Sequence, residues 1–119
     1  MRILTADDSQ FMRTILKGII EKAFPGVEVL EAGNGVEALE LYRIKRPDVM
    51  LLDLVMPEKG GIDVLKEIGA SKHGKIFVVS AVGQDAIIQE ALSLGADAFI
   101  VKPFDEKKVV DAVRSATEK

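Results

Sequence analysis

Five polar residues stand where an apolar run ends and a polar, helix-starting segment begins. They are Asp7, Asp8, Asp53, Ser80 and Lys102. The runs before them have the composition of strands buried in a parallel sheet. Because parallel strands end at the same edge of an open sheet, these five side chains are expected to share one crevice. Three carboxylates, one hydroxyl and one ammonium group are suited to magnesium-assisted phosphoryl transfer.

Three carboxylates in one crevice repel one another unless a cation lies between them. Mg²⁺ prefers a few carboxylate oxygens together with water, which favours direct ligation by Asp8 and Asp53 and a water-mediated contact with Asp7. Three aspartates, Lys102 and Mg²⁺ carry −3, +1 and +2, so the charges sum to zero. Such a site accepts a phosphoryl group of about −1.5 to −2. The alternative is that one of the aspartates only caps the next helix. A helix cap needs a single residue, and Ser9 can provide it.

Asp53 is the candidate nucleophile, since it comes directly after the central apolar run, 49–52, and lies between the candidate metal ligands and Ser80. A carboxylate that attacks phosphorus forms an aspartyl phosphate. Lys102 is expected to pair with one phosphoryl oxygen and the Ser80 hydroxyl to bond another, so that catalysis rests on positioning and charge stabilisation. Each residue alone is also a common cap or turn residue, and it is their joint placement that favours the chemistry.

The elements that position these residues alternate five times between a strand-like run and a helical pattern. The predicted strands are 2–6, 27–32, 48–52, 75–80 and 97–101. The predicted helices are 9–23, a second that Asn34-Gly35 starts and Pro47 closes, 61–70, 84–94 and 105–117. Five consecutive strand–helix units predict an α/β fold, a doubly wound five-stranded parallel sheet in the order 2-1-3-4-5 with helices on both faces. That order places strands one and three side by side.

Apolar side chains at helical spacing predict the faces that the helices bury. They are Phe11, Met12, Ile15, Leu16, Ile19 and Ile20 in the first helix, Val36, Leu39, Leu41 and Ile44 in the second, and Val109, Val110 and Val113 in the fifth.

His73, the only histidine, lies in the polar segment 71–74 and is expected to be solvated. A single loop histidine does not suit a phosphohistidine donor, so we interpret the chain as a receiver of phosphate.

Composition narrows the classes of partner. The chain of 119 residues is predicted to form one domain, 1–119; it is 48% hydrophobic, has a net charge of −3 and contains no cysteine. It lacks the basic balance typical of nucleic-acid binding, and no apolar run approaches the roughly 20 residues of a membrane span. The N-terminus has no signal-peptide layout. We therefore expect a cytoplasmic monomer with no nucleic-acid and no membrane partner.

Motifs at the strand ends resemble those of a known family. They are Ala6-Asp7-Asp8, Leu52-Asp53-Leu54-Val55-Met56-Pro57, Ser80-Ala81, Lys102-Pro103-Phe104 and the loop residue Gly61. Over the whole chain they resemble the receiver domains of two-component response regulators, in particular CheY-like single-domain regulators. The resemblance implies a flavodoxin-like sheet and a signalling module, which is no enzyme beyond catalysing its own phosphorylation and slow dephosphorylation.

The resemblance also assigns roles to residues. It implies transfer of a phosphoryl group from a histidine kinase to Asp53 and a cis peptide bond between Lys102 and Pro103. The Mg²⁺ ligands that it implies are Asp7, Asp8, Asp53 and the backbone carbonyl of Val55. Lys59 and Gly60 differ from the residues most often found after the Met-Pro pair in this family, here Met56-Pro57, but no essential group is lost.

The family's switch pairs the strand-four hydroxyl with an aromatic residue on strand five, here Ser80 and Phe99. Phosphate would draw Ser80 inward, and Phe99 would move into the space left behind. Phe99 has no hydroxyl, which excludes any hydrogen bond from its tip. The surface that such a switch would control is formed by helix four, strand five and helix five.

Several functions remain open at this point. Within the family we favour a chemotaxis-type regulator with a downstream protein such as a flagellar switch component; a phosphorelay intermediate and a receiver excised from a longer regulator are the alternatives. Met1 lies close to the first strand, which favours a natural start.

Two further alternatives come from other classes of protein. An aspartate-dependent phosphatase would carry two aspartates two positions apart after strand one, whereas Asp7 and Asp8 are adjacent. A flavodoxin-type cofactor carrier needs a phosphate loop there, which two carboxylates would repel.

The lifetime of an aspartyl phosphate gives a first prediction. Val55 and Val82 stand two residues after Asp53 and Ser80, at positions that help to set this lifetime in the family. Neither valine can orient an attacking water, so we predict slow self-dephosphorylation. The loss of phosphate from purified, Mg²⁺-saturated protein measures the lifetime, and a half-life of a few seconds would contradict the prediction.

Overall fold

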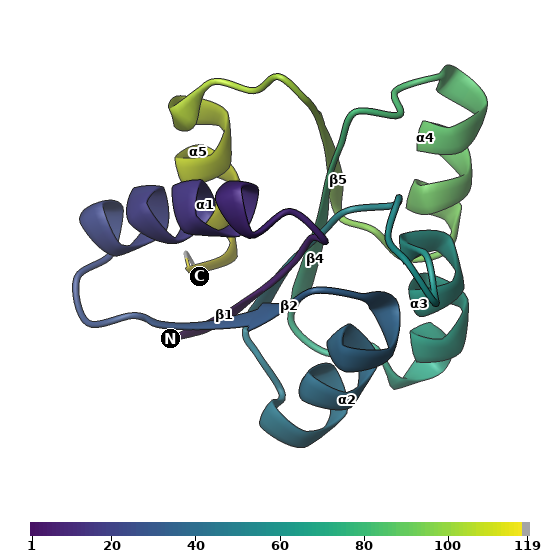
Figure 1. Cartoon of the computed structure of the whole chain (residues 1–119), viewed down its shortest axis with the longest axis horizontal. Coiled ribbons are helices and arrows are strands. Elements are labelled where there is room, and N and C mark those ends of the chain that lie inside the picture. The colour runs from purple at the N-terminus through teal and green to yellow at the C-terminus, as the bar shows by residue number, and fades with distance from the viewer. Residues whose placement is uncertain (118–119) are drawn as a thin grey trace.

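Five parallel strands form a single sheet in the order β2-β1-β3-β4-β5 (Figure 1). The computed structural model describes residues 1–117, so the last two residues of the predicted domain 1–119 lie outside the described residues. The strands are β1 (Arg2–Ala6), β2 (Glu28–Ala32), β3 (Val49–Leu52), β4 (Lys75–Ser80) and β5 (Ala98–Val101). The predicted sheet order is confirmed, and the predicted strand bounds agree to within one residue.

The helices lie in two layers on either side of the sheet (Figure 1). They are α1 (Gln10–Ala23), α2 (Gly35–Lys45), α3 (Gly61–Ile68), α4 (Asp85–Ser93) and α5 (Glu106–Thr117). Helices α1 and α5 bury their apolar side chains against one face, and α2, α3 and α4 against the other. The third helix ends earlier than the predicted 61–70, because a short 3₁₀ turn, Gly69–Ser71, replaces its last residues.

Two polar side chains start the helices that flank the first two strands. Ser9 caps α1, since its hydroxyl accepts a hydrogen bond from the Met12 N–H at 3.2 Å. Asn34 caps α2 in the same way through the Glu37 N–H at 2.8 Å. Because Ser9 provides the cap of α1, Asp7 and Asp8 are left free for another role.

The buried faces of two helices differ from those predicted. In α1, Leu16 and Ile20 are buried as expected, but Phe11 is 76% exposed and Ile15 37% exposed. In α2, Val36 and Ile44 are exposed, contrary to the predicted stripe. The face that α2 does bury comprises Gly35, Ala38, Leu39 and Tyr42. These residues have the spacing of one helical face. The prediction was right for Leu39 but missed the rest, because it counted only the larger aliphatic side chains and left out glycine, alanine and tyrosine.

The prediction of a solvated loop histidine was wrong. His73 is only partly exposed, and its ring stacks on that of Tyr42 with centroids 4.3 Å apart and planes 21° from parallel. The Tyr42 hydroxyl donates to the His73 carbonyl at 2.7 Å and accepts from the His73 N–H at 2.8 Å. One buried hydroxyl therefore satisfies both backbone groups of His73 and ties α2 to the loop before β4.

No helix within residues 1–117 combines the length and the apolar character needed to cross a bilayer.

The buried Tyr42 hydroxyl predicts a loss of stability at alkaline pH. Burial raises the pKa of Tyr42 above its usual value of 10.0, and the bond from the His73 N–H opposes this only in part. The folded state therefore keeps its proton when the unfolded state has lost it. The contribution is fully present below pH 10 and is lost as pH rises through the folded pKa. Urea unfolding of the wild type and Tyr42→Phe on both sides of this pH measures the difference.

Tyr42→Phe provides the control for this prediction. The variant should be less stable at neutral pH by about 1–3 kcal/mol, because two backbone groups of His73 lose their partner. Its deficit should shrink as pH rises above 10. The chain has a single tyrosine, so phenolate absorbance reports this ring alone. A deficit that stays constant with pH would contradict the assignment.

Candidate functional site

Hydrogen bonds of the sheet extend one residue beyond the strand ends into three of the site residues. The Asp7 N–H donates to the Ala32 carbonyl at 3.0 Å, and the Asp53 N–H donates to the Ala6 carbonyl at 2.9 Å. The Lys102 N–H donates to the Ser80 carbonyl at 2.9 Å. The backbone of each site residue is therefore fixed by the neighbouring strand. This arrangement brings side chains from β1, β3 and β5 to the carboxyl edge of the sheet, as predicted.

Lys102 lies between two buried carboxylates. Its Nζ is 2.7 Å from Asp7 Oδ2 and 3.0 Å from Asp53 Oδ2. Asp7 is 3% exposed and Asp53 is 7% exposed, whereas Asp8 is exposed to solvent. A buried carboxylate without a partner is costly, so the ammonium group stabilises both anions within the crevice.

The two aspartates also act on the lysine. Burial by itself lowers the pKa of Lys102, but hydrogen bonds and charges from Asp7 and Asp53 outweigh it, so the pKa lies above its usual value. Lys102 therefore stays protonated throughout the neutral range. A permanent positive charge stands beside the Asp53 carboxylate, where a phosphoryl oxygen would lie.

The acidic cluster has the donor set of a hard cation. Asp7, Asp8 and Asp53 each offer one carboxylate oxygen, and these oxygens lie within 4.8 Å of one another. The Ser9 N–H holds Asp7 Oδ1 at 2.9 Å, and the Val55 N–H holds Asp53 Oδ1 at 3.2 Å. Three carboxylates and Lys102 leave a charge of −3 + 1 = −2. These oxygens and this charge fit Mg²⁺.

Ser80 and Phe99 occupy the positions expected for the switch. Ser80 is fully buried at the end of β4, and its Oγ accepts from the Val82 N–H at a long 3.4 Å. Phe99 is partly buried and packs against the core on the side of α2, α3 and α4. Ser80 pairs with Val101 and Val78 with Phe99, so Ser80 and Phe99 point to the same face of the sheet. Their movement stays a prediction.

The loop after Asp53 is packed closely against the start of α3. The Gly61 N–H donates to the Leu54 carbonyl at 2.9 Å, and a Cβ on Gly61 would collide with the Asp53 carbonyl oxygen. The peptide bond between Lys102 and Pro103 is cis, as predicted. The position of Asp53, the predicted nucleophile, thus depends on a glycine eight residues later in the chain.

Lys59 is held by contacts that the sequence analysis missed. Its ammonium group pairs with Glu67 of α3, and its backbone carbonyl lies against Gly35 so closely that a Cβ there would collide with it. Gly35, directly after the capping Asn34, was the only sequence signal of this contact. The loop 53–60 is thereby supported by both α2 and α3.

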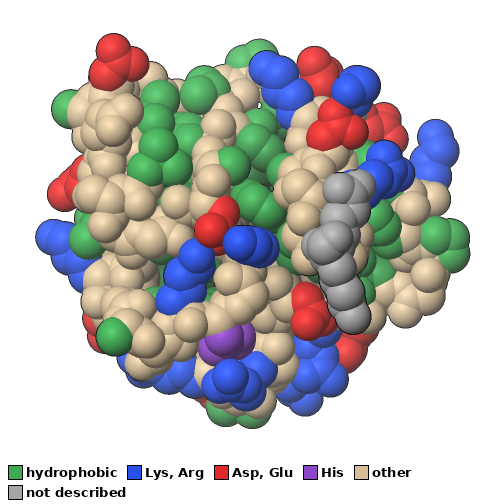
Figure 2. Space-filling view, turned by 180° about the vertical axis from the view of Figure 1, so that it is seen from behind, with side chains coloured by type: hydrophobic (Ala, Val, Ile, Leu, Met, Phe, Trp, Pro, Cys, Tyr) green, Lys and Arg blue, Asp and Glu red, His purple; other side chains and the backbone are tan. Residues whose placement is uncertain are grey.

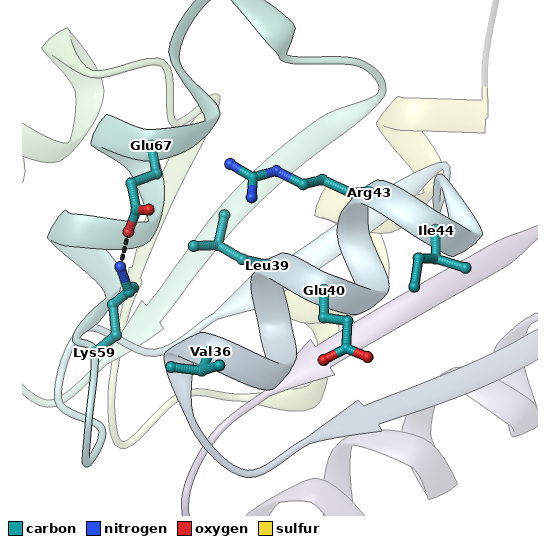
Figure 3. Close-up of a pocket in the computed structure, with 7 residues that line it drawn as sticks. All are labelled: Val36, Leu39, Glu40, Arg43, Ile44, Lys59 and Glu67. Carbon is teal, nitrogen blue, oxygen red and sulfur yellow. Dashed lines mark hydrogen bonds and ion pairs between the residues drawn. The ribbon is translucent and has the colours of Figure 1, made fainter.

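A pocket of about 480 Å³ lies between α2 and α3, outside the acidic cluster (Figure 3). Its lining residues are Val36, Leu39, Glu40, Arg43, Ile44, Lys59 and Glu67. None of the three aspartates contributes to it. The chemistry expected at the sheet edge is therefore separate from this groove, whose lining includes none of the five residues that the sequence singles out.

Similarity to known proteins agrees with this geometry. The family described as response regulator receiver domain matches residues 3–114. The chain belongs to that family. Chemotaxis protein CheY of Thermotoga maritima is 48% identical over 119 residues, which cover 98% of each chain. CheY of Bacillus subtilis is 43% identical over 114 residues, which cover 94% of this chain and 93% of that protein.

A solved structure gives the same result for the fold. The crystal structure of the response regulator domain of Thermotoga maritima CheB matches with a TM-score of 0.84 and 35% identity, over 98% of this chain and 93% of that one. The predicted flavodoxin-like order and the resemblance to CheY-like receivers are both confirmed. The family connects the acidic edge of this receiver domain with signalling.

The close contact at Gly61 gives a prediction. In Gly61→Ala the new Cβ meets the Asp53 carbonyl and the Leu54 side chain, so the loop must shift, at a cost of about 1–3 kcal/mol. Mg²⁺ affinity should fall as well, because the shift moves Asp53. Urea unfolding and a Mg²⁺ titration measure the two effects.

Gly18→Ala is the matched control. Gly18 lies in α1 with no heavy atom within 4 Å of an added Cβ, so alanine should raise stability by about 0.5–1 kcal/mol. Mg²⁺ affinity should not change in this variant. If both variants raised stability, the close packing of the Asp53 loop would be disproved.

Proposed function

We propose that this receiver domain is switched when a histidine kinase transfers a phosphoryl group to Asp53. The observation that supports the proposal best is the position of Lys102, whose ammonium group is within hydrogen-bond distance of both Asp7 and Asp53. A nucleophile, a fixed cation and a cluster of oxygen donors then lie in one crevice. The similarity to CheY proteins supports the same interpretation.

In the proposed reaction, a carboxylate oxygen of Asp53 attacks the phosphorus atom of a phosphohistidine. The new O–P bond forms as the P–N bond breaks, and the imidazole leaves with the bonding electrons and takes up a proton. Lys102 pairs with one phosphoryl oxygen and the Ser80 hydroxyl donates to another. The three aspartates and the Val55 carbonyl would hold Mg²⁺, whose positive charge would offset the charge of the phosphoryl group.

The proposed response starts at Ser80. A hydroxyl drawn to the phosphoryl group would leave space on the face where Phe99 packs, and Phe99 would turn inward. Both side chains point to the same face, which supports a coupled movement. The surface of α4, β5 and α5 would then change its affinity for a protein partner. In this proposal the domain is a signalling module, and its only catalysis is its own phosphorylation and dephosphorylation.

Chemotaxis is the proposed pathway, with a flagellar switch component as the downstream protein. The relatives named chemotaxis protein CheY support this choice over a phosphorelay intermediate. Co-purification separates the two: a chemotaxis regulator should retain a flagellar switch component after phosphorylation, and a relay intermediate should retain a histidine phosphotransfer protein.

Intact-mass spectrometry tests the proposed acceptor. After incubation with acetyl phosphate and Mg²⁺, the wild type should gain one phosphoryl group, whereas Asp53→Asn should gain none because the amide is a poor nucleophile. Asp63→Asn, the same change at an exposed aspartate of α3, should still gain one group. Chelation of Mg²⁺ should suppress the adduct. A wild type that binds Mg²⁺ but gains no mass would show a scaffold that signals without phosphate.

A further inference from the structure

A second charged pocket lies at the opposite edge of the sheet from Asp53. It has a volume of about 90 Å³ and is lined by Tyr42, Arg43, Arg46, Ile68, Ser71 and His73. These residues belong to the carboxyl end of α2, the end of α3 and the loop that leads into β4. The lining includes two guanidinium groups and no carboxylate.

Several polar side-chain groups of this pocket have no hydrogen-bond partner within residues 1–117. Neither Arg43 nor Arg46 takes part in a salt bridge or a side-chain hydrogen bond among the described residues, and the same is true of the Ser71 hydroxyl. His73 Nε2 is buried and also lacks a partner there. Arg43, Arg46 and Ser71 are exposed, so water can serve their donors, and the buried Nε2 of His73 is the group that needs a partner. Its position beside two arginines favours a ligand that accepts hydrogen bonds.

One nearby carboxylate, that of Asp97, is already engaged elsewhere. Asp97 pairs with Lys72 at 2.8 Å and lies 3.8 Å from Lys75. The two arginines therefore add positive charge at a corner of the molecule where the carboxylate of Asp97 is already paired with lysine. Figure 2 shows blue Lys and Arg side chains beside the purple histidine, on a chain whose net charge is negative.

Arg46 stands in a conformation that usually belongs to glycine. It caps the carboxyl end of α2 with φ 46° and ψ 61°, in the left-handed region. A side chain there is disfavoured by sterics, so glycine would suit the backbone better. From this position Arg46 lines the pocket. Arg43, one turn earlier, extends from α2 towards α3 (Figure 3).

The floor of the pocket is preorganised. The Tyr42 hydroxyl is fully used by the two backbone groups of His73, and the stacked rings fix the imidazole. A ligand would therefore meet Arg43, Arg46, Ser71 and the imidazole, each of which can donate a hydrogen bond. A volume of 90 Å³ exceeds the space of a single water and suits a group of a few heavy atoms.

We propose that the pocket between the carboxyl end of α2 and the loop before β4 binds a small phosphate oxyanion. Guanidinium groups bind such oxygens through paired, charge-assisted hydrogen bonds. The anion would be inorganic phosphate or the phosphate of a small monoester. This site is independent of Asp53 and of Mg²⁺, since it shares no residue with the acidic cluster.

A titration of the full-length chain with inorganic phosphate tests the site. It is monitored by amide resonances in the presence of a chelator, which prevents Mg²⁺-dependent binding at the acidic edge. Saturable shifts are expected at Arg46, Ser71 and His73. Arg46→Gly should weaken binding at least about tenfold, because one guanidinium is lost. Glycine suits the left-handed backbone, so this variant should fold, and Arg43→Gln provides a second variant with the same expected loss.

Lys45→Gln is the matched control. It removes one positive charge from the same turn of α2, but Lys45 does not line the pocket. Its phosphate affinity should stay within about twofold of the wild type, because an exposed charge is screened by salt. Shifts that do not saturate, or equal weakening in Lys45→Gln and Arg46→Gly, would show charge attraction alone and overturn the proposal.

A parallel titration with glycerol phosphate identifies the source of the anion. Tighter binding of the ester than of inorganic phosphate would assign the site to a phosphate monoester. Tighter binding of inorganic phosphate would assign it to the free anion. If neither produced saturable shifts at Ser71 and His73, the pocket would not be a phosphate site.

Discussion

The parallel pairing of β1 with β3 is the constraint on which the acidic edge depends. Ile3 pairs with Val49 and Ala6 with Leu52, so Asp7 and Asp53 each come after a paired residue at the same level of the sheet. A slip of one residue would turn Asp53 to the other face. Because β3 is apolar, buried on both faces and flanked by Asp48 and Asp53, such a slip would also draw one of these carboxylates into the buried part of the sheet, and this cost favours the observed register.

The fixed register gives Lys102 its effect. It arrives from β5, two strands from β3, yet its long side chain reaches both buried carboxylates. Such a group adds little net stability, because the desolvation of three charges offsets most of their attraction. It does hold the Asp53 carboxylate, the Lys102 ammonium group and the oxygen donors of the acidic cluster in fixed positions. That preorganised charge is what phosphoryl transfer requires of a protein.

The sequence predicted the sheet, its order and the five polar residues, since all of these depend on strong local signals. Continuous apolar runs mark buried strands, and the residue directly after each run lies at the carboxyl edge. The helix faces were harder to predict. Phe11 and Val36 have the right residue type, but packing depends on which face meets the sheet, and Ala38 and Tyr42 occupy that face of α2.

Long-range contacts were beyond local reasoning for a related reason. The stacking of His73 on Tyr42 joins residues 31 positions apart, and no pattern near either one indicates it. The contact of Gly35 with Lys59 is of the same kind. A loop position and a polar neighbourhood suggested solvent around His73, whereas the tertiary structure provided an aromatic partner.

The sheet hydrogen bonds that hold Asp7, Asp53 and Lys102 have a consequence for motion. Their amide protons are bonded to the ends of neighbouring strands, so they should exchange with solvent only when the sheet itself opens. The reactive side chains are thus carried by backbone that should open only with the sheet, although they lie at its rim. The loop 53–60 is held by α2 and α3 as well, so the site should stay rigid on both sides of Asp53.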